Sequence, residues 1–535
     1  MKKYIKLITA VVVLGLASCD SDFTEINTDP DKASGEIFDP NLILPDALYK
    51  YANSTTGYRG PILFQSMWVQ LMASTSTIAN YYTNADKYVP SGSTPGYAAS
   101  IWSDNYRVAS EMYQMKKLAI DKGYPNLANI ADIVKIQSIA FMSDVYGDVP
   151  YNEALQLEDG ISRPSYDKQE ELYPQLLEEL NTAISALDTS ADSPTNDIFY
   201  DGDISKWKKF GYSLMLKMAM RLVNVDESLA QSYVETASAG GVFASTADEA
   251  ILLTDNSTGF HNSNSAALAT ASDYYEVRWS DVMIDYLNST DDPRLSVIAE
   301  VPEAGLAANQ DASLSGDSDP TIQLGMPNGY DLNGGATDIS NAPDYPGPTD
   351  ANGEGDSDAP IGAYSRPTSM YRNLEAPVFV LTYAETQLLL AEAAVRGYNV
   401  GGTAAEYYAD GLSGAMTAIN KYGGSQIATA DITAYVAANP LDVSSTEASL
   451  KMINIQYWAT TGLLGNFTEA WSNWRRSAYP ELNPVNYIGN FSNGTIPVRQ
   501  IYPADESTYN PENYSAAASA MGGDVWTSNV WWDNN

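Results

Sequence analysis

Residues 382–397 read TYAETQLLLAEAAVRG, and this stretch indicates the fold class. Thr382 and Glu385 stand three residues apart, which is the spacing of a capping box at the start of a helix. Gly397 suits the left-handed residue that follows a last helical turn. Apolar residues between these ends recur at intervals of three and four, at Ala384, Leu388, Ala391 and Val395. Such a stripe predicts a helix with one buried face.

Two similar stripes precede this helix in the chain. The first consists of Leu176, Leu177, Leu180, Ile184 and Leu187, and the second of Trp207, Phe210, Leu214, Met218 and Leu222. Further helices are expected over about 404–421 and 446–476. We therefore predict an all-α fold with a helical scaffold over about 42–239 and 382–478.

The segment between the two helical parts, about 240–381, has a different composition. Gly, Pro, Asp, Asn and Ser crowd it, most densely over 311–358, and these residues favour turns and long loops. A loop-rich segment of this length is either a flexible linker between domains or a structured insertion. Because apolar and aromatic residues such as Ile322 and Leu324 continue through it, we favour a structured, irregular insertion.

The N-terminus carries a secretion signal. Basic residues (Lys2, Lys3, Lys6) precede an apolar run over 7–17, which is too short to span a bilayer as a helix. The sequence LASC then ends at Cys19, in the order of a bacterial lipobox. We predict that residues 1–18 are a cleaved signal peptide and that Cys19 receives a lipid, which anchors the protein to a membrane.

Charge and rare residues exclude several classes of protein. The net charge is −38, which argues against nucleic-acid binding because phosphates require Lys and Arg. The single Cys is assigned to the lipid, and the single His cannot build a multi-histidine zinc site or a Cys–His catalytic pair within one chain. No catalytic residues and no metal ligands of these kinds are predicted.

Six segments, in this order, resemble the SusD/RagB family of Bacteroidetes outer-membrane lipoproteins, and specifically its SusD-like subgroup. They cover residues 144–154 (DVYGDVPYNEA), 164–187, 202–221 (beginning GDISKWKKF), 383–397, 469–480 (EAWSNWRRSAYP) and 496–503. We interpret these segments as determinants of the fold. Arg475 and Arg476, for example, are suited to pair with acids or to bridge helix ends.

The resemblance implies an architecture and a function. Members of the family are all-α proteins built on four tetratricopeptide-like helix pairs, with a loop-rich portion that carries the ligand site. The family implies one SusD-like domain over 19–535, held in the outer membrane and facing the cell exterior. There it would cover a SusC-like TonB-dependent transporter, capture an oligosaccharide or a peptide, and deliver it for import, without acting as an enzyme.

Two other functions remain open from the sequence. A surface glycoside hydrolase needs two carboxylates across a sugar bond, and the chain has 67 acidic residues from which to supply them. A purely structural lid of the transporter would need no ligand at all.

We expect the ligand surface to use aromatic residues from two loop-rich stretches, because flat rings pack well on the C–H faces of sugars. These residues are Tyr81, Tyr82 and Tyr88 in the first stretch, and Tyr274, Tyr275, Trp279 and Tyr330 in the second.

No resident cofactor is predicted. Calcium, if it binds, is expected among the aspartates of the insertion, where glycines allow tight turns. These aspartates are Asp311, Asp317, Asp319, Asp350, Asp356 and Asp358.

Overall fold

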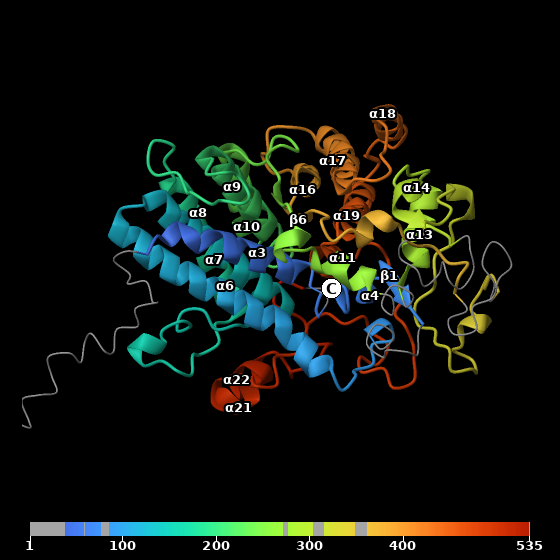
Figure 1. Ribbon diagram of the computed structural model, residues 1–535, viewed down its shortest axis with the longest axis horizontal. Helices are drawn as coiled ribbons and strands as arrows, with labels where there is room; N and C mark the ends of the chain where they lie inside the picture. The colour runs from blue at the N-terminus through green and yellow to red at the C-terminus, as the bar shows by residue number, and fades with distance from the viewer. Residues whose placement is uncertain are drawn as a thin grey trace, which may run out of the picture. The chain divides into compact units, whose positions relative to one another are not determined.

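Helices dominate the fold, as the sequence predicts (Figure 1). The computed structural model describes residues 38–57, 59–75, 85–270, 277–302, 315–347 and 361–533. Before the insertion lie α3 (Leu44–Thr55), α4 (Gln65–Trp68), α6 (Thr94–Lys122), α7 (Pro125–Tyr146), α8 (Gln169–Ala186), α9 (Ile204–Met220) and α10 (Glu227–Gly240). After it lie α16 (Tyr383–Val395), α17 (Ala404–Ile419), α18 (Thr429–Ala438), α19 (Thr446–Leu463) and α20 (Phe467–Ser477). In the described ranges, no helix is both long and apolar enough to cross a bilayer.

The helices pack as consecutive pairs. Consecutive helices in extensive contact include α6 with α7, α7 with α8, α9 with α10, α16 with α17, and α19 with α20. Only Gly123 and Tyr124 separate α6 from α7, so the chain has to reverse direction between these two helices. α16 also contacts α9 and α19, and it therefore joins the N-terminal group of helices to the C-terminal group.

The start and the end of α16 follow the sequence prediction. Thr382 and Glu385 form both hydrogen bonds of a capping box, and Gly397 has a φ of +83°. The long helix expected over 446–476 is instead two helices. Gly465, at φ +77°, ends the first, and Asn466 caps the second by accepting a hydrogen bond from the Glu469 N–H. A residue with positive φ cannot continue a helix, which explains the break.

Segments far apart in the sequence meet in a buried polar network. Arg221 on α9 donates to Glu469 on α20 at 2.6 Å and to Asp144 on α7 at 3.3 Å. Arg475 donates to the backbone carbonyl of Asp144 at 2.7 Å. These contacts join three of the six segments that carry the family resemblance. This supports the interpretation of those segments as determinants of the fold.

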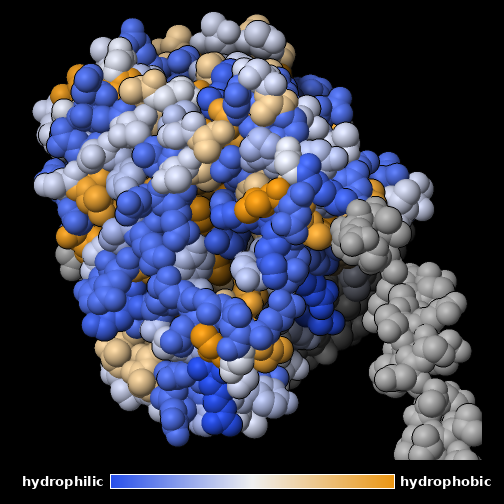
Figure 2. All heavy atoms as spheres, turned by 90° about the vertical axis from the view of Figure 1, so that its left-hand side faces the viewer, coloured by the Kyte–Doolittle hydropathy of each residue, from blue (hydrophilic) through white to orange (hydrophobic). Residues whose placement is uncertain are grey.

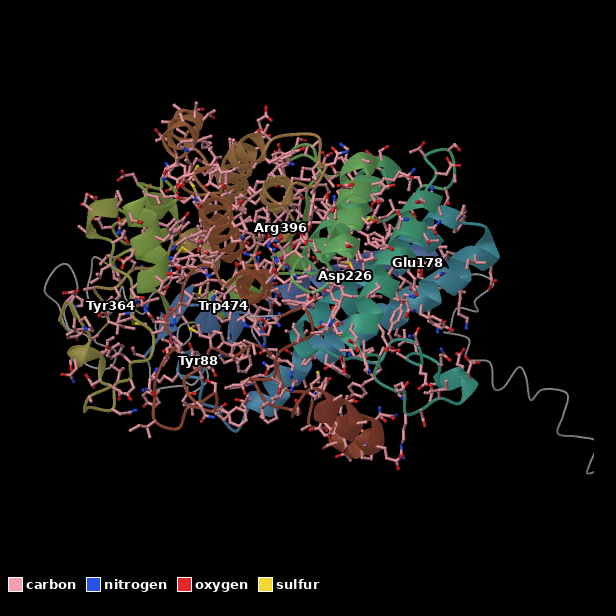
Figure 3. All side chains as sticks on the ribbon, turned by 180° about the vertical axis from the view of Figure 1, so that it is seen from behind. Tyr88, Glu178, Asp226, Tyr364, Arg396 and Trp474 are labelled. Atoms are coloured by element: carbon pink, nitrogen blue, oxygen red, sulfur yellow. The ribbon has the colours of Figure 1, made fainter. Side chains whose placement is uncertain are left out.

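The insertion is folded wherever the structure describes it. It contains α11 (Ser263–Ala269), α13 (Asp281–Ser289) and α14 (Leu295–Ile298), together with short strands. Three antiparallel pairs tie it down: β1 (Met72–Ser74) with β3 (Val277–Trp279), β2 (Ala250–Leu252) with β6 (Val378–Leu381), and β4 (Ala299–Glu300) with β5 (Arg366–Pro367). A small second core around Met326, Ile339 and Tyr364 lies within it (Figure 3).

The C-terminal tail is mostly irregular, but it closes the main core. It contains α21 (Glu506–Tyr509) and α22 (Pro511–Ala520), which lie together at the lower edge of Figure 1. Trp526 and Trp532 from the tail are fully buried, and Trp526 packs on Trp68 with ring centroids 5.4 Å apart. The tail is therefore part of the fold.

Candidate functional site: a polar cleft beside the insertion

A cleft of about 320 Å³ lies where four separate segments of the chain meet. They are the end of the turn before β1, the start of α13, the insertion over 327–337, and the tail over 483–486. Its polar lining consists of Gln70, Asp281, Asn328, Tyr330, Thr337, Asn483 and Asn486. Amides, hydroxyls and one aromatic ring in a concave site form a surface suited to a ligand with many hydroxyl groups.

Backbone hydrogen bonds hold the insertion against the start of α13. Met326 N–H donates to the Trp279 carbonyl at 2.9 Å, and Asp281 N–H donates to the Met326 carbonyl at 3.1 Å. Gly325 allows this approach, since a Cβ on it would stand 2.4 Å from the Asp281 Cα. The insertion can therefore lie directly against the start of α13 only with glycine at this position.

A buried carboxylate supports the third wall. Asp86 accepts hydrogen bonds from the Gly329 N–H, at 2.7 Å, and from the Asn328 side chain. Asp86 also pairs with Lys87 at 3.4 Å, with both side chains almost completely buried. Asn328 additionally donates to the Met72 carbonyl at 2.9 Å, which fixes it on the edge of β1.

Asp281 is the charged group of the cleft. Burial, together with the negative charges of Asp285 and Asp86, raises the pKa of its carboxyl to about 6. The Val282 N–H donates to its Oδ1 at 2.7 Å. Among the residues that the structure describes, no Lys, Arg or His forms an ion pair with it.

Of the seven predicted ligand-binding aromatics, Tyr330 lies in this cleft, where it is half-buried. Tyr81, Tyr82, Tyr274 and Tyr275 lie outside the described residues, so their assignment stays a prediction.

Tyr88 and Trp279 have a different place in the structure from the one predicted. Both side chains are 0% exposed and belong to the main core (Figure 3 labels Tyr88). In the conformation seen here, neither ring can stack on a ligand, and we reassign both residues to the fold. The error arose because loop-forming neighbours were used as a sign of exposure.

Sequence reasoning missed most of the cleft. Asp281, Asn328 and Asn483 belong to no motif, and they lie 47 and 155 residues apart in the chain. One local signal was available: residues 327–330 read PNGY, a turn sequence with a tyrosine beside it.

A larger cleft of about 710 Å³ lies elsewhere, between α6, α7, α8 and residues 151–159. Its two lysines, Lys116 and Lys135, both pair with Asp132, at 2.6 and 3.6 Å, and Tyr151 donates to Glu179. The face on the left-hand side of Figure 1 is covered mainly by hydrophilic residues, with hydrophobic ones scattered (Figure 2). We prefer the smaller cleft because the loop-rich insertion builds one of its walls.

The calcium prediction is tested only in part of the insertion. Asp311, Asp350, Asp356 and Asp358 lie outside the described residues. Asp319 is described, and its carboxylate accepts hydrogen bonds from the N–H and hydroxyl of Thr321. Within the described ranges, no group of three or more His, Cys, Asp or Glu side chains could hold a metal ion. Calcium binding stays a prediction.

These features define an α-helical protein built on helix pairs, with a polar cleft carried by a loop-rich insertion. The chain belongs to the SusD-like family: the family model described as "Starch-binding associating with outer membrane" matches residues 32–503. No curated protein matches the chain.

Solved structures show the same fold over almost the whole chain. A chitin-binding protein is 29% identical, with a TM-score of 0.77 over 93% of this chain and 100% of its own. A structure named Bacteroidetes AC2a SusD-like is 24% identical, with a TM-score of 0.75 over 93% of this chain and 100% of its own. A chitin-binding SusD homolog from Flavobacterium johnsoniae is 22% identical, with a TM-score of 0.70 over 93% and 98%. For the last two structures, whose identity is below 25%, the similarity to this chain shows the fold alone.

Proposed function

We propose that this protein is a surface nutrient-binding lipoprotein that captures an oligosaccharide in the polar cleft and delivers it to a SusC-like TonB-dependent transporter. The observation that carries the proposal is the cleft itself, with Tyr330 among side-chain amides in a member of a family described as starch-binding. The 29% identical chitin-binding protein favours a glycan over a peptide as the ligand.

The composition of the cleft argues against a glycoside hydrolase. Hydrolysis of a glycosidic bond needs two carboxyl groups on opposite sides of that bond. Among the described residues that line the cleft, Asp281 is the only carboxylate. Capture without cleavage therefore accounts better for the residues present, and the absence of products from a bound glycan would support it.

The binding experiment compares wild type with Tyr330→Ala by calorimetry over a panel of starch-derived, chitin-derived and peptide ligands. We expect a glycan to bind, and Tyr330→Ala to weaken it about tenfold, which is the effect of losing one well-packed aromatic contact. The matched control is Tyr509→Ala, because Tyr509 is 70% exposed and does not line the cleft. Equal loss of affinity in both variants would show that Tyr330 is not part of the binding site. If no ligand of the panel binds, a structural lid is favoured.

The anchor and the partner are tested together in native envelopes. We expect the wild type to take up a labelled fatty acid and to co-purify with a TonB-dependent barrel in mild detergent. Cys19→Ala should carry no label, because the thiol that accepts the lipid is gone. Labelling that persists in Cys19→Ala contradicts the anchor, and wild type recovered without a barrel contradicts the lid role.

A further inference from the structure

The polar cleft contains a negative charge for which the protein supplies no counter-charge. Asp281 is the first residue of α13, and its carboxylate lines the cleft with one backbone N–H bonded to Oδ1. In the described part of the chain no cationic side chain reaches it within ion-pair distance. The start of a helix favours a carboxylate, but burial here disfavours its ionised form, and an approaching cation would stabilise that form.

The other charges near Asp281 are negative or already neutralised. Asp285 lies one turn further along α13, and it is exposed. Asp86 is buried behind the insertion wall of the cleft, and Lys87 pairs with it. Lys87 also donates to the Ser74 carbonyl at 3.0 Å. Lys87 is therefore engaged behind the wall.

The acidic part of the insertion cannot provide a cation either, and three arginines elsewhere in the insertion already pair with acids: Arg294 with Asp292, and Arg366 and Arg372 with Glu300. Residues 303–365 contain eleven Asp and Glu residues and no Lys, Arg or His. Residues 76–84 and 271–276 also contain no Lys, Arg or His. The 327–337 wall belongs to this acidic stretch, and no Lys, Arg or His of the described residues pairs with Asp281, so the cation that fits this position is one carried by the ligand.

We propose that the cleft recognises an oligosaccharide with a free, positively charged amino group, which pairs with Asp281 while the sugar ring packs on Tyr330. The chemical class is an amino sugar that is not acetylated, and the inference rests on the proposed function. An ammonium group donates three hydrogen bonds, and a carboxylate beside amide oxygens can accept them. Asn483 and Asn486 also line the cleft, and their side chains carry such oxygens.

The same geometry sets the pH dependence. Because burial holds the pKa of Asp281 at about 6, the carboxylate is mainly ionised at pH 7 and mainly protonated at pH 5. Asp285 and Asp86 also act on this pKa, and both raise it. Affinity for the amino sugar should therefore fall between pH 7 and pH 5, while affinity for the acetylated sugar should change little.

The test uses two chitin-derived hexasaccharides of equal length, one fully acetylated and one fully deacetylated, in calorimetry on the full chain at pH 7. We expect wild type to bind the deacetylated form about tenfold more tightly, the scale of one charge-assisted hydrogen bond. Asp281→Asn should bind both forms equally, because the amide keeps the shape and loses the charge. Asp285→Asn is the control, and it should keep the preference.

Three results would overturn the inference. The first is acetylated sugar bound as tightly as the deacetylated one by wild type. The second is a preference for the deacetylated sugar that survives in Asp281→Asn. The third is loss of that preference in Asp285→Asn to the same degree as in Asp281→Asn. Either of these two results would assign the preference to the overall negative charge of the protein. If Asp281→Asn melts well below wild type, Asp281→Ser replaces it, since serine can still accept a backbone N–H at a helix start. Failure of the proposed function looks different: neither hexasaccharide nor any other glycan of the panel binds.

Discussion

Trp279→Ala should lower the free energy of unfolding by about 3–5 kcal/mol, the usual cost of removing a buried tryptophan. The side chain is fully buried in β3, packs on Tyr371 with ring centroids 5.4 Å apart, and donates from Nε1 to the Ile298 carbonyl at 2.9 Å. Truncation therefore leaves a cavity and an unpaired carbonyl. Urea denaturation followed by circular dichroism measures the loss.

Tyr330→Ala is the matched control for Trp279→Ala, because both residues belong to the insertion and only Tyr330 lines the cleft. We expect Tyr330→Ala to change stability by less than about 1 kcal/mol, as half-buried surface positions usually do. The reassignment of Trp279 to the core would be wrong if Trp279→Ala unfolded like wild type but bound glycan more weakly.

Glu392→Gln should also cost about 3–5 kcal/mol, because it leaves a buried arginine without its counter-charge. Glu392 accepts two hydrogen bonds from Arg476, at 2.6 and 2.7 Å, and both side chains are almost fully buried. Arg396, one turn later on α16, adds a third at 2.9 Å (labelled in Figure 3). The pair joins α16 to α20, so its loss should weaken the contact between these helices.

The control for the buried pair is the exposed pair Lys451–Glu481, with N and O 3.2 Å apart and side chains 48% and 74% exposed. Glu481→Gln should cost less than about 1 kcal/mol, since water screens such a pair. Equal effects of the two substitutions would show that burial of the Glu392 pair contributes nothing.

Acid titration provides an independent measurement of the same pair. Burial raises the pKa of Glu392, but Arg476 and Arg396 outweigh burial and hold the pKa at about 2. Because this value lies below that of an unfolded glutamate, the pair stabilises the fold fully above about pH 4.5. The stabilisation is lost as the pH falls towards 2. Glu392→Gln should therefore show a shallower loss of stability with acid than wild type.

The scaffold was predictable because its signals are local. The capping box at Thr382, the stripe that follows it and Gly397 all lie within four turns of one another. The buried pair between Glu392 and Arg476 was partly visible too, because Arg476 was expected to find an acid. Its partner was not predictable, since it lies 84 residues away in the sequence.

The site was much less predictable, for a physical reason. Trp279 lies in a three-residue strand whose partner, Met72, comes 207 residues earlier in the chain. A strand this short carries no periodicity, so the sequence cannot distinguish its core side chains from those of a loop. Asp281 became a candidate only when the structure showed the cleft and the missing counter-charge together.

The pairing of β2 with β6 has a consequence for protein engineering. The two strands lie at the beginning and the end of the insertion, and Ala250 stands opposite Leu381. Neighbouring strands lie about 4.8 Å apart. The two ends of the insertion therefore lie next to each other on the helical scaffold. Segments with adjacent ends are those that tolerate exchange best. We therefore expect that grafting the residues between these strands from one relative to another transfers ligand preference. The graft has to include β3, the strand that pairs with β1.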